Sequence, residues 1–246
     1  MNHAPVTTIY IARHGKSEMN NQRLVTGQLD PALSDKGVAQ SEALARLLQY
    51  EPLSAIYTSA LERTAQTAAP TACQHGLTPV ALAALNEINL GVLQGRHRDE
   101  RDSEAAAIWA QWQEAMWRYR VPGAESFEEL HQRAGAALQQ ILERHHGETV
   151  LIVGHSGTNR VLLGTLLGLP LEQWPALRPS NKTVHRIRLH AQLRASEPQL
   201  EAVRTPEPQP TQEAQRIPEW QRAPEHVELA FKEERNKHAT QSAHAA

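Results

Sequence analysis

The feature that most constrains the fold is an alternation of short apolar runs with longer amphipathic stretches. The apolar, β-prone runs predict strands near 7–12, 54–58, 79–82, 149–153 and 184–190. Helical spacing of apolar residues predicts helices at about 34–49, 61–75, 100–118, 125–145 and 157–167. This order of elements is typical of an α/β layer fold. The run at 149–153 is apolar throughout, which predicts a central parallel strand.

Two local signals refine this picture. Ser126 precedes the helix expected at 125–145 and Glu129 follows three residues later, which predicts a capping box. Cys73 falls within the helix expected at 61–75, where we predict a small core residue. As the single cysteine of the chain it excludes an internal disulfide framework.

The composition narrows the class of protein. With 246 residues, 40% hydrophobic and 21% charged, the chain is typical of a soluble globular protein. A net charge of -2 gives no global basic field, so we expect no nucleic-acid partner. No apolar run reaches the length of a membrane span, and the start lacks the basic and apolar regions of a signal peptide. We therefore expect a cytoplasmic protein that does not bind membranes.

The C-terminal part differs in composition from the rest. Six of the fifteen prolines follow residue 195, and no glycine follows Gly168. We predict a globular domain over 1–205, closed by a last strand pair within 186–204. We predict a polar, flexible tail rich in Pro, Gln and Glu over 206–246, with a short helix near 225–238.

Polar side chains follow several predicted strands where each strand ends. Arg13 and His14 follow the first strand, Arg63 the second, Glu87 the third and His155 the fourth. Ligands of open α/β sheets bind at the carboxyl ends of the strands, so we expect these side chains to meet. Each alone has a simpler interpretation: a salt-bridged strand end, a packed histidine, a solvated helix residue or a cap.

Together these residue types favour phosphoryl transfer through a phosphohistidine. Arginine forks match the oxygens of a phosphate group. Neighbouring arginines disfavour a protonated imidazole, which leaves a ring nitrogen free to attack phosphorus. A carboxylic acid can then protonate the leaving alkoxide. Helix N-termini at 157 and beyond Arg63 would add backbone N–H donors for the anion.

Five ordered blocks resemble the signatures of the histidine phosphatase superfamily, in its phosphoglycerate-mutase-like branch. They are "RHG", "SALERTAQTA", "LNEINLGVLQG", "PGAESFEEL" and "VGHSGTNRVLL", and the resemblance spans about residues 6–190. It implies a three-layer α/β/α sandwich with a mostly parallel central sheet. It also implies that His14 becomes phosphorylated, that Glu87 is the proton donor, and that the phosphoryl group is held by Arg13, Arg63 and His155.

The same resemblance implies a set of phosphate- and substrate-binding residues: Gly15, Asn20, Thr26, Gly27 and Ser156. It implies neither a cofactor nor a metal ion. The expected partner is a small phosphorylated metabolite, and a homodimer is an open option.

The chain departs from the family pattern at Lys16, where glutamate is usual, and at Leu93, where tryptophan is frequent. It also lacks the long insertion of the cofactor-dependent mutases, so we expect a wetter site and a phosphatase. A phosphoglycerate-type mutase and a catalytically inactive phosphate-binding scaffold are the alternatives. The loop residues Arg96, His97, Arg98 and Arg101 contact substrate or form a solvated helix start. Trp109 and Trp112 share a helix face, which favours packing over a substrate platform.

Overall fold

A six-stranded sheet forms the centre of the computed structural model, which describes residues 5–190 and 225–230. Its strand order is β3-β2-β4-β1-β5-β6. The strands are β1 (Val6–Arg13), β2 (Leu53–Ser59), β3 (Val80–Leu82), β4 (Thr149–Gly154), β5 (Thr183–His190) and β6 (Glu225–Ala230). Strands β1 to β4 are parallel to one another, whereas β5 runs antiparallel to β1 and β6 antiparallel to β5.

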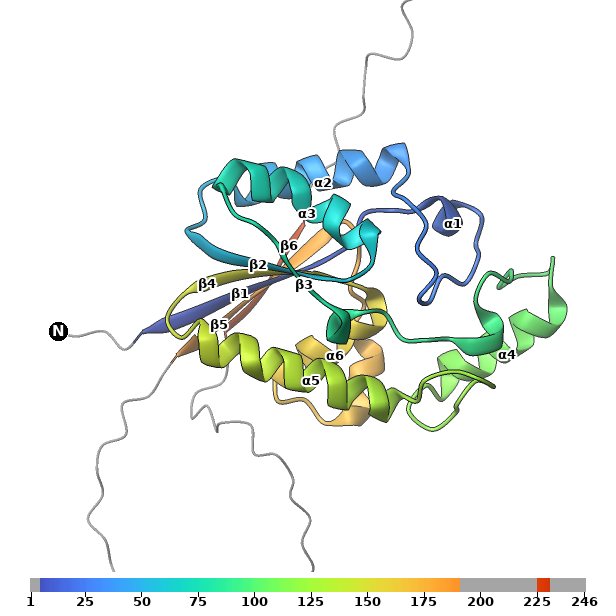
Figure 1. Cartoon of the computed structure of the whole chain (residues 1–246). Helices are drawn as coiled ribbons and strands as arrows, with labels where there is room; N and C mark the ends of the chain where they lie inside the picture. The colour runs from blue at the N-terminus through green and yellow to red at the C-terminus, as the bar shows by residue number, and fades with distance from the viewer. Residues whose placement is uncertain (1–4, 191–224, 231–246) are drawn as a thin grey trace, which may run out of the picture.

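Helices cover both faces of this sheet (Figure 1). The α-helices are α1 (Glu18–Asn21), α2 (Asp35–Leu48), α3 (Glu62–His75), α4 (Ser103–Glu114), α5 (Phe127–Arg144) and α6 (Ser156–Leu166). Three 3-10 turns cover Ala83–Leu85, Gly91–Leu93 and Leu171–Ala176. Helices α2 and α3 pack on one face and α5 and α6 on the other, so the predicted three-layer α/β/α sandwich is confirmed.

The two faces of the sheet bury separate hydrophobic clusters. In β1, Ile9 and Ile11 belong to the cluster under α5 and α6, whereas Tyr10 and Ala12 belong to the cluster under α2 and α3. Successive side chains of a strand point to opposite faces, so a strand covered on both faces must be apolar throughout. Strand β4 follows the same pattern, and its position between β2 and β1 confirms the predicted central parallel strand.

The helix boundaries follow their caps. Ser126 and Glu129 form the predicted capping box of α5. Helix α4 covers Ser103–Glu114 and not the predicted 100–118. The side chain of Asp102 accepts from the backbone N–H of Ala105, so the helix starts there. The prediction for Cys73 was wrong, since its side chain is exposed on α3. Within the described parts of the chain, no helix combines the length and apolar character needed to cross a membrane.

The C-terminal part contributes a strand to the sheet. Residues 225–230 form β6, so the prediction of a helix near 225–238 was wrong over these residues. The other strand expected within 186–204, and the rest of the tail, lie outside the described residues. The domain boundary at residue 205 therefore stays a prediction, and at least one segment beyond it pairs with the domain.

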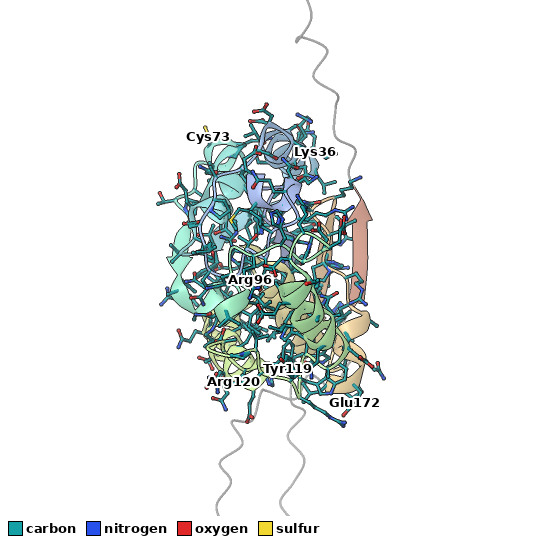
Figure 2. All side chains as sticks on the ribbon, turned by 90° about the vertical axis from the view of Figure 1, so that its right-hand side faces the viewer. Lys36, Cys73, Arg96, Tyr119, Arg120 and Glu172 are labelled. Atoms are coloured by element: carbon teal, nitrogen blue, oxygen red, sulfur yellow. The ribbon has the colours of Figure 1, made fainter. Side chains whose placement is uncertain are left out.

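Strands β1, β2 and β4 end at the same edge of the sheet because they are parallel. Their last residues are Arg13, Ser59 and Gly154. Helices α1 and α4 lie at this end of the molecule (Figure 1), and Figure 2 looks onto it. The topology thus brings together the polar residues that the sequence places after these strands.

Candidate active site

His14 follows β1 and its side chain is held in one tautomer. Its backbone N–H donates to the carbonyl of Gly154, and the residue is only 4% exposed. Ring Nδ1 lies 2.7 Å from the carbonyl oxygen of Gly15. Because a carbonyl can only accept, Nδ1 carries the proton and Nε2 keeps its lone pair.

The surroundings of His14 also keep the ring neutral. Burial, followed by the positive charges of Arg13 and Arg63, holds the pKa of His14 well below its usual 6.5. The imidazole is therefore uncharged at neutral pH, and its Nε2 is chemically competent as a nucleophile.

His155 lies beside His14, with 5.1 Å between the ring centroids. Its Nδ1 is 3.1 Å from Nη2 of Arg63 and its Nε2 is 2.8 Å from Oγ of Ser59. A guanidinium only donates, so Nδ1 accepts and Nε2–H donates to Ser59. Burial and the charge of Arg63 lower the pKa of His155 well below its usual value, which leaves this ring neutral as well.

Ser59 is a site residue that the sequence analysis missed. It accepts from His155 and from the backbone N–H of Leu61, and its own hydroxyl therefore donates to Oγ1 of Thr64 at 2.9 Å. A hydroxyl at the end of β2, directly before the Arg63 block, was the available signal. Ser59 fixes the tautomer of His155.

Arg63 is only 1% exposed and its donors are almost fully used. Nη1 donates to the carbonyl of Leu29 at 2.6 Å and contacts Oδ1 of Asp30 at 3.4 Å. Nη2 donates to the carbonyl of Gly27 at 2.8 Å and to His155. Of the five N–H bonds of a guanidinium, the buried Nε–H is left without a partner in the described structure. Arg63 thus fixes the loop over the site and contributes its positive charge beside His14.

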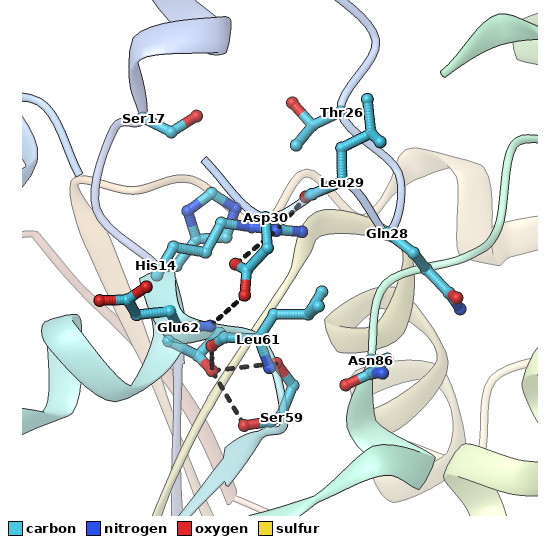
Figure 3. Close-up of polar contacts among 12 residues, drawn as sticks. His14, Ser17, Thr26, Gln28, Leu29, Asp30, Ser59, Leu61, Glu62 and Asn86 are labelled. Atoms are coloured by element: carbon cyan, nitrogen blue, oxygen red, sulfur yellow. Dashed lines mark hydrogen bonds and ion pairs between the residues drawn. The ribbon is translucent and has the colours of Figure 1, made fainter. Parts of the chain in front are cut away.

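Asp30 connects this loop to α3 and was also missed. The N-cap residue of α3, Leu61, has no side chain that can cap the helix. Oδ2 of Asp30 accepts from the backbone N–H of Glu62 at 2.8 Å instead, while Oδ1 faces Arg63 (Figure 3). The N-terminus of α3 thus lies at Glu62, just before Arg63 and not beyond it as expected, and the N–H of Glu62 is occupied by this carboxylate.

Replacement of Asp30 by alanine should destabilise the protein and loosen the site. We expect Asp30→Ala to lower the free energy of unfolding by about 1 kcal/mol, as for loss of an N-cap, and to raise KM. Asp30→Asn is the matched control, because its amide oxygen can still accept from Glu62. Urea unfolding measures the first effect and steady-state kinetics the second. Equal losses in Asp30→Asn and Asp30→Ala would contradict the capping role.

Helix α1 and the loop that follows it to Asp30 carry three of the predicted substrate-binding residues. Asn20 accepts from the backbone of Ser17 at 3.2 Å, and its Nδ2 contacts Oγ1 of Thr26 at 3.5 Å. Gly27 has a φ of 51°, and a Cβ there would lie 2.2 Å from Oε1 of Gln94. The loop is therefore tightly placed, and Figure 3 draws Thr26, Gln28 and Leu29 along it.

Gly15 and Ser156 occupy positions directly after the two histidines. The N–H of Gly15 donates to Oγ1 of Thr67 at 2.9 Å, and a Cβ at Gly15 would lie 2.5 Å from the carbonyl of Gly37. The geometry thus explains Gly15 by close packing, with its N–H already used. Ser156 is the first residue of α6.

Glu87 is held at the N-terminus of α6. Its Oε1 accepts from the backbone N–H groups of Gly157 at 3.0 Å, Thr158 at 3.2 Å and Ile88 at 3.0 Å. Its Oε2 lies 3.1 Å from the same N–H of Gly157. The N–H donors expected near residue 157 therefore bind a carboxylate of the protein itself.

Arg133 of α5 helps to hold Glu87 in this position. It forms an ion pair with Glu125 and donates to the backbone carbonyls of Ala84 and Glu87. Nothing in the helical pattern of α5 distinguished Arg133 from a surface residue. It fixes the segment that presents Glu87.

The arginines of the loop before α4 differ in whether an acidic side chain pairs with them. Arg96 binds Asp102 and Glu104, and Arg101 binds Asp99. In the part of the chain that the structure describes, Arg98 has no such acid pair. Its guanidinium lies over the ring of Trp109, 5.6 Å from the centroid.

Arg98 belongs electrostatically to the active site. Burial and the charge of Arg23 lower the pKa of Arg98, and the charge of Arg98 in turn contributes to lowering the pKa of Arg13. Trp109 packs against Trp112 with 5.2 Å between ring centroids, which agrees with the predicted shared face. Of the four loop residues proposed from the sequence, Arg98 is thus the arginine that has no acid pair in the described structure and whose charge acts on Arg13 of the site.

Metal ligation has no support among the residues described. No group of three or more His, Cys, Asp or Glu side chains there is arranged to hold a metal ion. The charges that face His14 are arginines.

Comparisons with known proteins show the family to which the chain belongs. A family model described as the histidine phosphatase superfamily (branch 1) matches residues 9–198. The chain belongs to this family. Within the superfamily, a protein named "Probable phosphoglycerate mutase GpmB" from Yersinia pestis (strain Pestoides F) is 36% identical over 183 residues, which is 73% of this chain and 83% of that protein.

Solved structures of the superfamily share the fold. A mycobacterial glucosyl-3-phosphoglycerate phosphatase superposes with a TM-score of 0.69 at 27% identity, covering 75% of this chain and 91% of that one. An alpha-ribazole phosphatase from Shigella flexneri gives a TM-score of 0.66 at 26% identity, covering 73% and 89%. The relatives of this member of the histidine phosphatase superfamily thus include both phosphatases and a mutase by name.

Proposed function

We propose that the protein is a phosphomonoesterase that hydrolyses a small phosphorylated metabolite through a phosphohistidine on His14. The observation that carries the proposal is the neutral imidazole of His14, with Nδ1 tied to the carbonyl of Gly15 and Nε2 free, between Arg13 and Arg63. A scaffold that only bound phosphate would not need a nucleophile held in one tautomer, nor a carboxylate at Glu87.

In the first step, Nε2 of His14 attacks phosphorus and the bond from phosphorus to the leaving oxygen breaks. A proton on Glu87 moves to that oxygen, so the alcohol leaves neutral. The arginines stabilise the charge on the transferring group. In the second step a water oxygen attacks phosphorus, its proton passes to Glu87, and the bond to Nε2 breaks. The free imidazole and inorganic phosphate result, with no need for a metal or cofactor.

The mutase is the second candidate, favoured by the name of the Yersinia pestis relative. A mutase must keep water away from the phosphoenzyme. Here α4 and α5 are joined directly by residues 115–126, without a further helical element to close the site. We therefore prefer hydrolysis.

Incubation with p-nitrophenyl phosphate across pH 5 to 8 tests the proposal. We expect release of nitrophenol and inorganic phosphate in equal amounts. Absence of turnover throughout this range would favour the binding scaffold. Isomerisation of a phosphoglycerate without release of phosphate would favour the mutase.

Arg98 should contribute to substrate binding more than to chemistry. We expect Arg98→Ala to raise KM by about tenfold for substrates that carry a second anionic group, with a small change in kcat. Arg101→Ala on the same loop is the control, because Arg101 is already paired with Asp99. A fall in kcat at constant KM would place Arg98 in the chemical step instead.

A further inference from the structure

The seat of Glu87 is built for a carboxylate. All of the contacts to its side-chain oxygens described above are N–H donors: the backbone amides of Ile88, Gly157 and Thr158. A protonated carboxyl group needs an acceptor for its own hydrogen, and these contacts provide none. The hydroxyl of Thr158 also donates to the carbonyl of Asn86, which gives a second contact between α6 and the segment that carries Glu87.

Cationic side chains from three elements also interact with Glu87. Arg13 at the end of β1, Arg63 on α3 and Arg160 on α6 each interact electrostatically with this carboxylate. On α5, Arg133 is paired with Glu125. His14 and His155 add no positive charge, because burial and the arginines hold the pKa of each well below its usual value.

The reaction, however, needs a proton on Glu87 at the moment when the leaving oxygen departs. A phosphate monoester that binds beside His14 brings two negative charges close to Arg13 and Arg63. Those charges offset the attraction of the arginines for the carboxylate and repel the carboxylate directly, so they favour its protonation.

From this juxtaposition we propose that a bound tetrahedral dianion loads Glu87 with its proton, so that substrate binding is coupled to uptake of one proton from solvent. The inference rests on the proposed function, whose acid is Glu87. The loaded proton moves to the leaving oxygen in the first step and is replaced from water in the second. Release of phosphate then removes the negative charges that offset those of the arginines, and Glu87 returns its proton to solvent. Glu87 can therefore act as the general acid only while substrate is bound.

Isothermal titration with sulfate measures this coupling directly. Sulfate is a tetrahedral dianion that does not itself titrate between pH 5 and 8. Titrations at pH 7 in several phosphate-free buffers of different ionisation enthalpy give the number of protons taken up from the slope of the observed enthalpy. We expect about one proton for the wild-type protein and close to none for Glu87→Gln.

Gly157→Ala tests the seat while keeping the carboxylate. A Cβ at Gly157 would lie 2.6 Å from Oε1 of Glu87, so the carboxylate must leave the amides of α6. We expect the alkaline limb of the kcat profile to move to higher pH, since the displaced carboxyl group keeps its proton more easily, and proton uptake with sulfate to fall. Gly135→Ala on α5 is the matched control, because a Cβ there meets only the ring of His131 at 3.8 Å.

The outcomes separate the two proposals. A protein that turns over p-nitrophenyl phosphate but binds sulfate without taking up a proton would overturn the inference and leave the phosphatase intact. Uptake that persists in Glu87→Gln would also overturn it, since an imidazole would then be the acceptor. A wild-type protein without turnover would remove the basis of both.

Discussion

His14→Ala should abolish turnover, with kcat lower by about 10³-fold or more, because the variant has no atom that can form the bond to phosphorus. The covalent intermediate should disappear with it. Labelling with a ³²P substrate, followed by gel electrophoresis under alkaline conditions, detects phosphohistidine as an acid-labile band. We expect this band in the wild-type protein and none in His14→Ala.

A matched histidine variant makes the result specific. His146 is exposed at the end of α5, so His146→Ala should keep both turnover and labelling. Residual turnover in His14→Ala above a few per cent would reject His14 as the nucleophile. A label that survives in His14→Ala but is lost in His155→Ala would assign the covalent bond to the second ring.

The pH dependence follows from the same ring. The pKa of His14 is lowered, so the ring stays unprotonated as the pH falls through 6.5 and is lost as a nucleophile only well below that value. We therefore expect kcat/KM to persist on the acid side of pH 6.5. An acid limb centred at 6.5 would show a histidine with ordinary solvation.

Glu87→Gln should slow the reaction by about 10² to 10⁴-fold for alkyl phosphates, whose leaving alkoxide needs a proton. The loss should be much smaller for p-nitrophenyl phosphate, because nitrophenolate leaves without protonation. The ratio of kcat/KM for the two substrates, measured in both proteins, gives the effect independently of protein folding.

Glu143→Gln is the control, since Glu143 is exposed on α5 far along the helix from its start. An equal loss for both substrates would count against Glu87 as the acid. A rate of phosphoenzyme breakdown unchanged in Glu87→Gln would limit the role of Glu87 to the first step, which rapid-quench measurements would show.

The predicted meeting of the site residues has a simple explanation for three of them. Arg13, His14 and His155 lie at or directly after the carboxyl ends of parallel strands, so their meeting follows from the sheet alone. Arg63 and Glu87 lie a few residues further along, where the family blocks located them. The fold class followed from the apolar runs, because a strand buried on both faces has little choice of residue.

The contacts that set the chemistry were not predictable in this way. Asp30 caps α3 across 32 residues and Ser59 binds His155 across 96, so each depends on how distant segments approach each other. The N–H donors of α6 bind Glu87 for the same reason. Over residues 225–230 the predicted helix was a wrong choice of period: Val227 and Leu229 alternate in the sequence as in a strand, and this segment pairs with β5.

Strand β6 has a consequence for truncated forms of the protein. It pairs with β5 from Thr183 to Arg188, using backbone groups that would otherwise face outward along that margin of the sheet. A chain cut before Glu225 would bare this row of donors and acceptors, and a neighbouring polypeptide could bind there by strand addition. Shortened recombinant forms should therefore self-associate or aggregate more readily than the intact chain, whatever the state of their catalytic groups.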